Sequence, residues 1–86
     1  MRNLQAIVDL AYDASTYCAI GDSREQVNAR FRERGYKERT ASSSSDLVEP
    51  RLVLGGWSFR TFMLEITYGA DGKVHRCQLI SLVGAL

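Results

Sequence analysis

The hydrophobic period of this chain changes once, from helical spacing in the first third to alternation in the rest. Apolar residues recur every three or four positions over residues 3–18, which predicts an amphipathic helix with Val8 and Ala11 on its apolar face and Asp13 outside it. Over residues 61–68 every second residue is apolar, which predicts a strand. The core-facing positions of that strand are Phe62, Leu64, Ile66 and Tyr68. The two periods together predict an α+β domain.

A second helix is marked at both ends in the segment IGDSREQVNARFRERGY, residues 20–36. Asp22 or Ser23 can cap its first turn, and each is followed three residues later by a Glu or Gln that completes a capping box. A glycine near the end stands where helices need a left-handed residue. Only Val27 and Phe31 are strongly apolar between these ends, so the helix is expected to lie on a wider surface, a sheet.

The last hairpin is predicted from its turn. The Gly-Ala-Asp-Gly segment at residues 69–72 tolerates positive φ and leads into a strand over residues 74–83. Strict alternation along that strand would turn polar side chains toward the core. We therefore expect a bulge near His75 and Arg76 that returns Cys77 inward, with Leu79 following it.

Two further strands are expected upstream. One covers residues 51–54, and a short edge strand covers residues 36–41. The serine run at 42–45 has little to bury and is interpreted as a mobile loop. The order helix, helix, then three or four antiparallel strands predicts one two-layer α+β domain over residues 1–86, with both helices on one face of a meander sheet.

Size and charge limit the function. An 86-residue chain with 45% hydrophobic residues makes one small core, which leaves a homodimer open as a source of stability. A net charge of +1 provides no global attraction to nucleic acid or membrane. No apolar run is long enough to span a bilayer, and the first residues do not read as an export signal, so we expect a cytoplasmic location.

Cys18 and Cys77 are the only cysteines, and they stand far apart in the sequence. This spacing does not suggest a tetrahedral metal site or a thioredoxin-like motif. Two interpretations stay open. The cysteines are either two small buried side chains or one disulfide that joins the first helix to the last strand.

The residues needed for catalysis are scarce. His75 is the single histidine, and a dyad with Cys77 has no third group nearby to orient it. Asp9 and Asp13 lie one helical turn apart, but without further ligands we interpret them as a solvated face. Gly55 and the glycine after it lack the lysine of a phosphate loop. We predict no enzyme activity, no cofactor and no metal.

A basic run offers an alternative function. Residues 24–39 hold six basic side chains against three acidic ones, an excess of three. It can be a solvated helix surface, a patch for an acidic protein partner, or a nucleic-acid surface. The candidate patch consists of Arg30, Arg34, Lys37 and Arg39. Tyr36 is the single aromatic residue available for base stacking, which makes nucleic acid the weaker alternative.

Part of the chain resembles a known fold unit through a helix, then Gly-x-Ser-x-x-x-Val, then a hairpin ending in Tyr-x-x-Asp-Gly-x-Val. The matching residues are Gly21, Ser23, Val27, Leu64, Ile66, Tyr68, Asp71, Gly72 and Val74. The pattern resembles the β-lactamase inhibitory protein and the BamE-type outer-membrane lipoproteins, over roughly residues 3–83. The resemblance implies a scaffold that binds protein partners with its exposed sheet face and its loops.

The sheet face opposite the helices is the predicted contact surface, because large apolar side chains on an uncovered face are typical of interfaces. Its residues are Arg51, Trp57, Phe59, Arg60, Thr61 and Met63. We expect a non-enzymatic protein-binding module that covers part of a macromolecular partner or of a second copy of itself. Inhibitors, immunity or anti-defence factors and adaptors fit this description.

Overall fold

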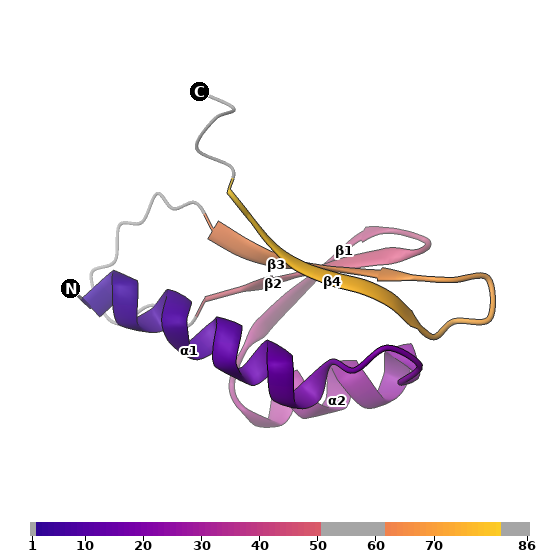
Figure 1. The fold of residues 1–86 in the computed structure, drawn as a ribbon, viewed down its shortest axis with the longest axis horizontal. Helices are drawn as coiled ribbons and strands as arrows, with labels where there is room; N and C mark the ends of the chain where they lie inside the picture. The colour runs from indigo at the N-terminus through magenta and orange to yellow at the C-terminus, as the bar shows by residue number, and fades with distance from the viewer. Residues whose placement is uncertain (1, 51–61, 82–86) are drawn as a thin grey trace.

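The computed structural model describes residues 2–50 and 62–81. The elements in this part of the chain are α1 (Arg2–Tyr17), α2 (Arg24–Glu33), β1 (Lys37–Ser42), β2 (Ser45–Glu49), β3 (Phe62–Tyr68) and β4 (Val74–Ser81). The strands form one antiparallel sheet in the order β1-β2-β3-β4. Both helices lie on one side of this sheet (Figure 1). The α+β class and the antiparallel meander predicted from the sequence are confirmed.

Helix α2 has the ends that the sequence predicts. The Ser23 hydroxyl accepts a hydrogen bond from the Gln26 backbone amide, and the Gln26 side chain accepts one from the Ser23 amide, both at 3.2 Å. Gly35 has a φ of 85°, the left-handed conformation that a glycine adopts without strain. Val27 and Phe31 are fully buried. The narrow apolar face of α2 therefore lies against the sheet and α1.

Helix α1 buries a face that matches the predicted one only in part. Ala6, Leu10 and Ala14 face the core, whereas 52% of Val8 is exposed and Ala11 is exposed too. The prediction that Val8 and Ala11 belong to the buried stripe was wrong. Apolar and small residues occupy much of the surface of α1, so their spacing does not select a single face.

The serine run is a tight turn and not a loop of four residues. Ser42 ends β1 and Ser45 begins β2, and the two residues pair across the hairpin. Strand β2 was not predicted from the sequence. Its two buried positions are Asp46 and Val48. A buried aspartate is unusual in a strand. Here the Asp46 carboxylate forms hydrogen bonds with the guanidinium of Arg24 in α2. The expected strand at 51–54 lies outside the described residues.

The predicted bulge in β4 is confirmed. Thr67 pairs with Arg76, while the next residue of β3, Tyr68, pairs with Val74, so His75 is the extra residue. Beyond it Cys77 pairs with Ile66 and therefore lies on the core side of the sheet. The bulge thus restores the register that lets β4 contribute apolar side chains to the core.

The sheet faces are as predicted. Leu64, Ile66 and Tyr68 are buried on the helix side, and Phe62, at the start of β3, is partly exposed. Phe31 lies edge-on to Tyr36 at 5.4 Å between ring centroids and to Tyr17 at 6.2 Å. This aromatic group joins the two helices. Among the described residues, none of the helices has the length and hydrophobicity needed to cross a bilayer.

Candidate functional site: the α1–β4 face

The predicted contact surface falls mostly outside the described residues. Met63 is described, and it is half-buried on the sheet face away from the helices. Around it that face is largely polar, with a hydrogen bond of 3.2 Å from Gln78 to Glu65 and an ion pair of 2.7 Å between Arg39 and Glu49. Arg51, Trp57, Phe59, Arg60 and Thr61 lie in the part of the chain without a description. Their role stays a prediction.

The arginines of the basic run lie beside acidic groups. Arg30 contacts Asp22 at 2.8 Å, and Arg34 contacts Asp13 at 3.4 Å. Arg39 pairs with Glu49 as described above, and of the four candidate patch residues Lys37 alone has no ion pair among the described residues. The positive charge of the run is therefore largely compensated within the fold.

Arg24 connects the start of α2 to the β1–β2 hairpin. Its guanidinium donates to both carboxylate oxygens of Asp46, at 2.7 and 3.1 Å. It also donates to the backbone carbonyls of Ser42, Ser43 and Ser45. The hydrogen bonds to Asp46 raise the pKa of Arg24. Because Asp46 is only 3% exposed, this arginine supplies the counter-charge for a carboxylate that is buried in β2.

Asp13 is buried, which contradicts its interpretation as part of a solvated face. It is 1% exposed, and its carboxylate accepts a hydrogen bond of 2.5 Å from the Tyr36 hydroxyl as well as contacting Arg34. These partners come from just beyond α2, so the helical spacing of α1 does not reveal them. Asp9 is only partly exposed and hydrogen-bonds to Gln5.

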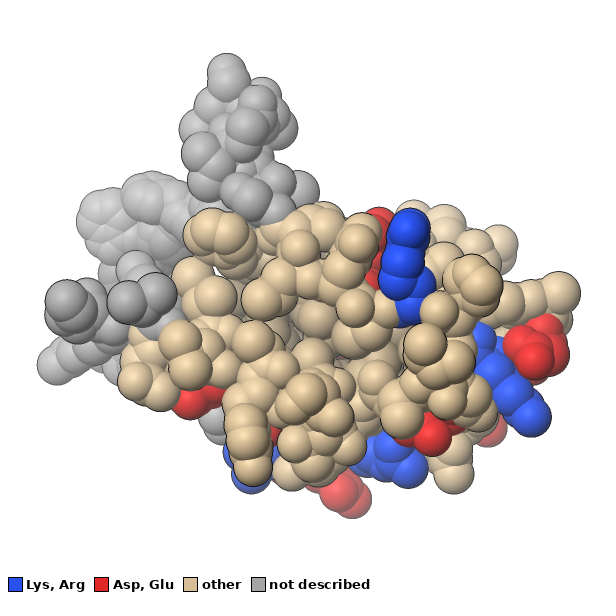
Figure 2. All heavy atoms as spheres, viewed as in Figure 1, with Lys and Arg blue, Asp and Glu red and all other residues tan. Residues whose placement is uncertain are grey.

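A largely uncharged surface with exposed apolar side chains covers the outside of α1 and continues onto β4. We call it the α1–β4 face and define it by Val8, Ala11, Tyr12, Ser15 and Leu79. Tyr12 is 69% exposed and Leu79 is 39% exposed. Figure 2 shows this side of the molecule, where uncharged residues occupy most of the area over α1 and β4 and charged residues lie toward its margins.

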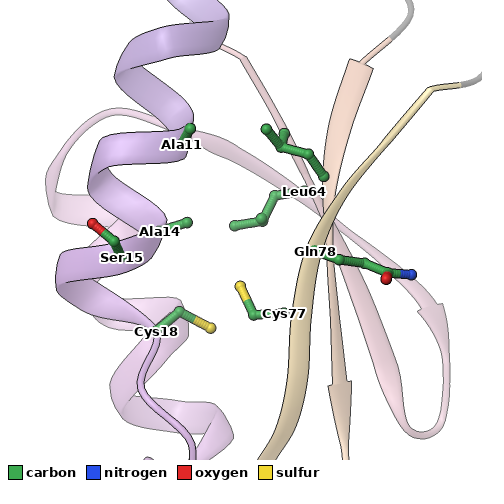
Figure 3. A pocket seen from close by; sticks show the side chains of 8 residues that line it. Ala11, Ala14, Ser15, Cys18, Leu64, Cys77 and Gln78 are labelled. Carbon is green, nitrogen blue, oxygen red and sulfur yellow. The ribbon is translucent and has the colours of Figure 1, made fainter.

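A pocket of about 300 Å³ opens in this face. It is lined by Ala11, Ala14, Ser15, Cys18, Leu64, Cys77, Gln78 and Leu79. Figure 3 shows Ala11 and Ala14 pointing from α1 toward Leu64 on β3, with the gap between helix and sheet beside them. The pocket exists because the α1 side chains that line it are small: Ala11, Ala14 and Ser15. Since no lining residue is charged, the pocket suits an apolar group.

Strand β4 forms one edge of the sheet. Its only strand neighbour in the described part of the chain is β3. The outer side of an edge strand presents backbone amide and carbonyl groups that can pair with another strand. At the start of β4 this outer side is already used, since Val74 accepts a hydrogen bond from the Gly21 amide at 3.0 Å and donates one to the Asp22 carbonyl at 2.8 Å. Beyond Val74, the pocket and the exposed stripe of α1 lie next to backbone groups of β4 that no other strand of the described residues pairs with.

The two cysteines meet at one end of the pocket. Both thiols are free, and Figure 3 shows the two sulfur atoms facing each other from the end of α1 and from β4. Interaction with Cys77, together with burial, raises the pKa of Cys18, whereas hydrogen bonding with Cys18 lowers the pKa of Cys77. Over the described residues, no group of three or more His, Cys, Asp or Glu side chains could hold a metal ion.

No protein-family model matches the chain, and no curated protein sequence or solved structure matches it. The resemblance to the β-lactamase inhibitory protein and the BamE-type lipoproteins therefore stays a prediction.

Proposed function

We propose that this protein is a non-enzymatic protein-binding module that takes an extended segment of a partner protein as an additional strand beside β4. The observation that carries the proposal is one juxtaposition. An edge strand, a pocket of about 300 Å³ and an exposed apolar stripe of α1 lie side by side. Strand addition uses these parts, since backbone pairing supplies affinity and pockets for alternate side chains supply specificity.

The chemistry of the surroundings specifies the segment further. An added strand would lie about 4.8 Å from β4 and would turn every second side chain toward α1. One apolar side chain would enter the pocket, and its neighbours would contact Val8 and Tyr12. Lys73, just before β4, and Arg76, near its start, are exposed and make no ion pair with other described residues. The segment therefore carries an acidic residue at that end.

This binding mode accounts for an inhibitory or adaptor role. A segment held along β4 is removed from its own protein's contacts, so the module occludes it without chemistry. The area involved is that of one short peptide and one helix face, which is small for a stable complex. Affinity would depend on the side chain in the pocket and on Tyr12, because a few buried anchors carry most of an interface's energy.

The test begins with a displayed library of random peptides selected on the immobilised protein. We expect the selected peptides to alternate apolar and other residues and to carry an acidic residue at one end. In the amide NMR spectrum of the labelled protein, the shifts caused by such a peptide should concentrate in β4 and α1. N-methylation of alternate peptide bonds should abolish binding, because it removes the donors that pair with β4.

A matched pair of variants locates the surface. Leu79 lines the pocket, whereas its neighbour Ile80 pairs with Met63 on the opposite face of the sheet. We expect Leu79→Lys to weaken peptide binding at least tenfold and Ile80→Lys to leave it unchanged, with circular dichroism confirming that both variants fold. The reverse result would assign binding to the Met63 face and overturn the proposal. A homodimer that dissociates on Leu79→Lys would overturn it too, since the occupant would then be a second copy.

A further inference from the structure

The end of the pocket holds a pair of thiols that come from distant parts of the chain. Cys18 follows the last residue of α1, and Cys77 lies in β4 opposite Ile66. Cys18 belongs to the buried core, and Cys77 packs against that core. Both line the pocket, and their sulfur atoms face each other at one end of it (Figure 3). Tertiary structure therefore places two nucleophilic side chains within one small cavity.

The two thiols differ in access. Cys18 is buried, whereas Cys77 is half-buried and borders the open pocket. A reagent that enters the pocket meets Cys77 first. Hydrogen bonding with Cys18 also lowers the pKa of Cys77, which increases the fraction of reactive thiolate at this position. Cys18 has the raised pKa, as expected for the thiol that donates.

We propose that Cys18 and Cys77 are an oxidative modification site, which a low-molecular-weight disulfide converts into an intramolecular disulfide between α1 and β4. This inference does not depend on the proposed function. It needs only the facing thiols and the opening that leads to them.

The reaction proceeds in two exchanges. The Cys77 thiol loses its proton to solvent, and its thiolate attacks one sulfur of the small disulfide RSSR, forming Cys77–S–S–R and releasing RS⁻. Cys18 then loses its proton and attacks the Cys77 sulfur, which forms the Cys18–Cys77 bond and releases the second RS⁻. Each released thiolate takes up one proton. In sum, two protein thiols are oxidised to a disulfide and RSSR is reduced to two RSH.

The bond would fix the end of α1 against β4. In the reduced protein the width of the pocket at this end depends on noncovalent packing between the helix and the sheet. In the oxidised protein the same distance is set by a covalent link. We therefore expect oxidation to raise the Tm and to reduce opening of the helix away from the sheet.

The test incubates the folded, reduced full chain in mixtures of reduced and oxidised glutathione. We expect a species lighter by two hydrogen atoms, resistant to iodoacetamide, whose tryptic map contains a peptide joined through Cys18 and Cys77. Its Tm should exceed that of the reduced protein, and dithiothreitol should reverse the change. A protein that keeps two alkylatable thiols in oxidised glutathione, or that forms only intermolecular disulfides, would overturn the proposal.

Single variants test the order of the two exchanges. Cys18→Ala should trap a mixed disulfide of glutathione on Cys77, while Cys77→Ala should leave Cys18 unmodified in the folded state. Faster modification of Cys18 than of Cys77 would contradict the order. If the Cys18 variant does not fold, alkylation of the reduced wild-type protein at limiting iodoacetamide gives the same comparison, with Cys77 expected to be labelled first.

Discussion

Single polar residues in this protein are buried where a partner far away in the sequence can reach them. Asp13 and Asp46 are both nearly inaccessible, and each is approached by an arginine and by a second donor, which for Asp46 is the Asn28 amide. For Asp13 the second donor is the hydroxyl of Tyr36. A buried carboxylate is tolerated only when such donors replace its water. The burial of both aspartates therefore depends on tertiary structure as much as on local sequence.

The Asp13 site leads to a first prediction about stability. Replacing Asp13 with Ala removes the 2.5 Å acceptor of the Tyr36 hydroxyl and a contact of Arg34 inside the fold. We expect the free energy of unfolding to fall by about 2–3 kcal/mol, the usual cost of breaking a buried polar pair. Urea denaturation measures it. Asp9→Ala is the matched control one turn away, with an expected change below about 0.5 kcal/mol; equal effects would contradict the account.

At the scale of elements, α2 is held to the sheet by its ends as much as by its two buried side chains. The capping box at Ser23 fixes where the helix begins, and Arg24 in its first turn reaches the β1–β2 hairpin. Arg24 also lies over the ring of Tyr68, at 4.8 Å from its centre. Helix, hairpin and β3 thus meet at one side chain.

The planar geometry of Arg24 is the basis of the second prediction. A lysine keeps the charge but cannot donate to both oxygens of Asp46 and to the hairpin carbonyls at once. We expect Arg24→Lys to lower the free energy of unfolding by about 1–3 kcal/mol. Arg32→Lys is the control, since Arg32 is largely exposed and lies 3.9 Å from Glu38. The prediction is wrong if thermal melts of the two variants coincide.

Glu38 in β1 yields a prediction about pH. Burial raises the pKa of Glu38. The nearby charge of Arg32 opposes this effect, and that of Asp46 adds to it. The folded state therefore binds this proton more tightly than the unfolded state, so the contribution of Glu38 to stability declines as the pH rises from about 4.5 through the raised pKa. The Asn28 amide, in the orientation that satisfies both carboxylates, donates to Glu38 at 2.7 Å and to Asp46 at 3.2 Å.

We expect Glu38→Gln to be more stable than the wild type at pH 7, because the amide oxygen still accepts from Asn28 without carrying a charge. The advantage should shrink as the pH is lowered toward 4.5, where the wild-type carboxyl becomes protonated. Urea denaturation across this range measures it. A constant difference between the two proteins, or a less stable variant at pH 7, would show that ionisation of Glu38 does not cost stability.

The whole molecule has a net charge of only +1, and its charged side chains are unevenly distributed over the surface. Acidic partners compensate most of the arginines in α2 and β1, whereas the α1–β4 face is largely uncharged (Figure 2). Binding of nucleic acid needs several cations free to replace counterions on phosphates. Binding of a protein segment needs an apolar anchor and accessible backbone groups. The distribution of charge therefore favours a protein segment over nucleic acid as the partner.

A DNA titration tests this at the scale of the molecule. We expect a labelled duplex of random sequence to bind more weakly than about 100 μM at about 150 mM salt, because most arginines of the described residues are paired with carboxylates. Fluorescence polarisation measures it, and Lys37→Ala with Arg39→Ala should leave the result unchanged. Micromolar binding that falls steeply with added salt and is lost in this double variant would restore the nucleic-acid alternative.

Short-range signals in the sequence were sufficient for much of the fold. The cap at Ser23, the end of α2 at Gly35, the alternation in β3 and the bulge at His75 were all predicted. Each depends on residues that lie within a few positions of one another. Caps, turns and alternation are decided by local backbone geometry, so a short stretch of sequence is enough to predict each of them.

Tertiary structure alone decided the burial of charge and the exposed face of α1. Strand β2 contains a buried Asp46 because Arg24, twenty-two positions earlier, is close in space. Helix α1 has small or apolar residues on much of its surface, and the position of β3 and β4 selects Leu10 for the core and leaves Tyr12 exposed. Desolvation of a charge and rotation of a helix depend on partners brought together by folding, and spacing along the chain does not specify those partners.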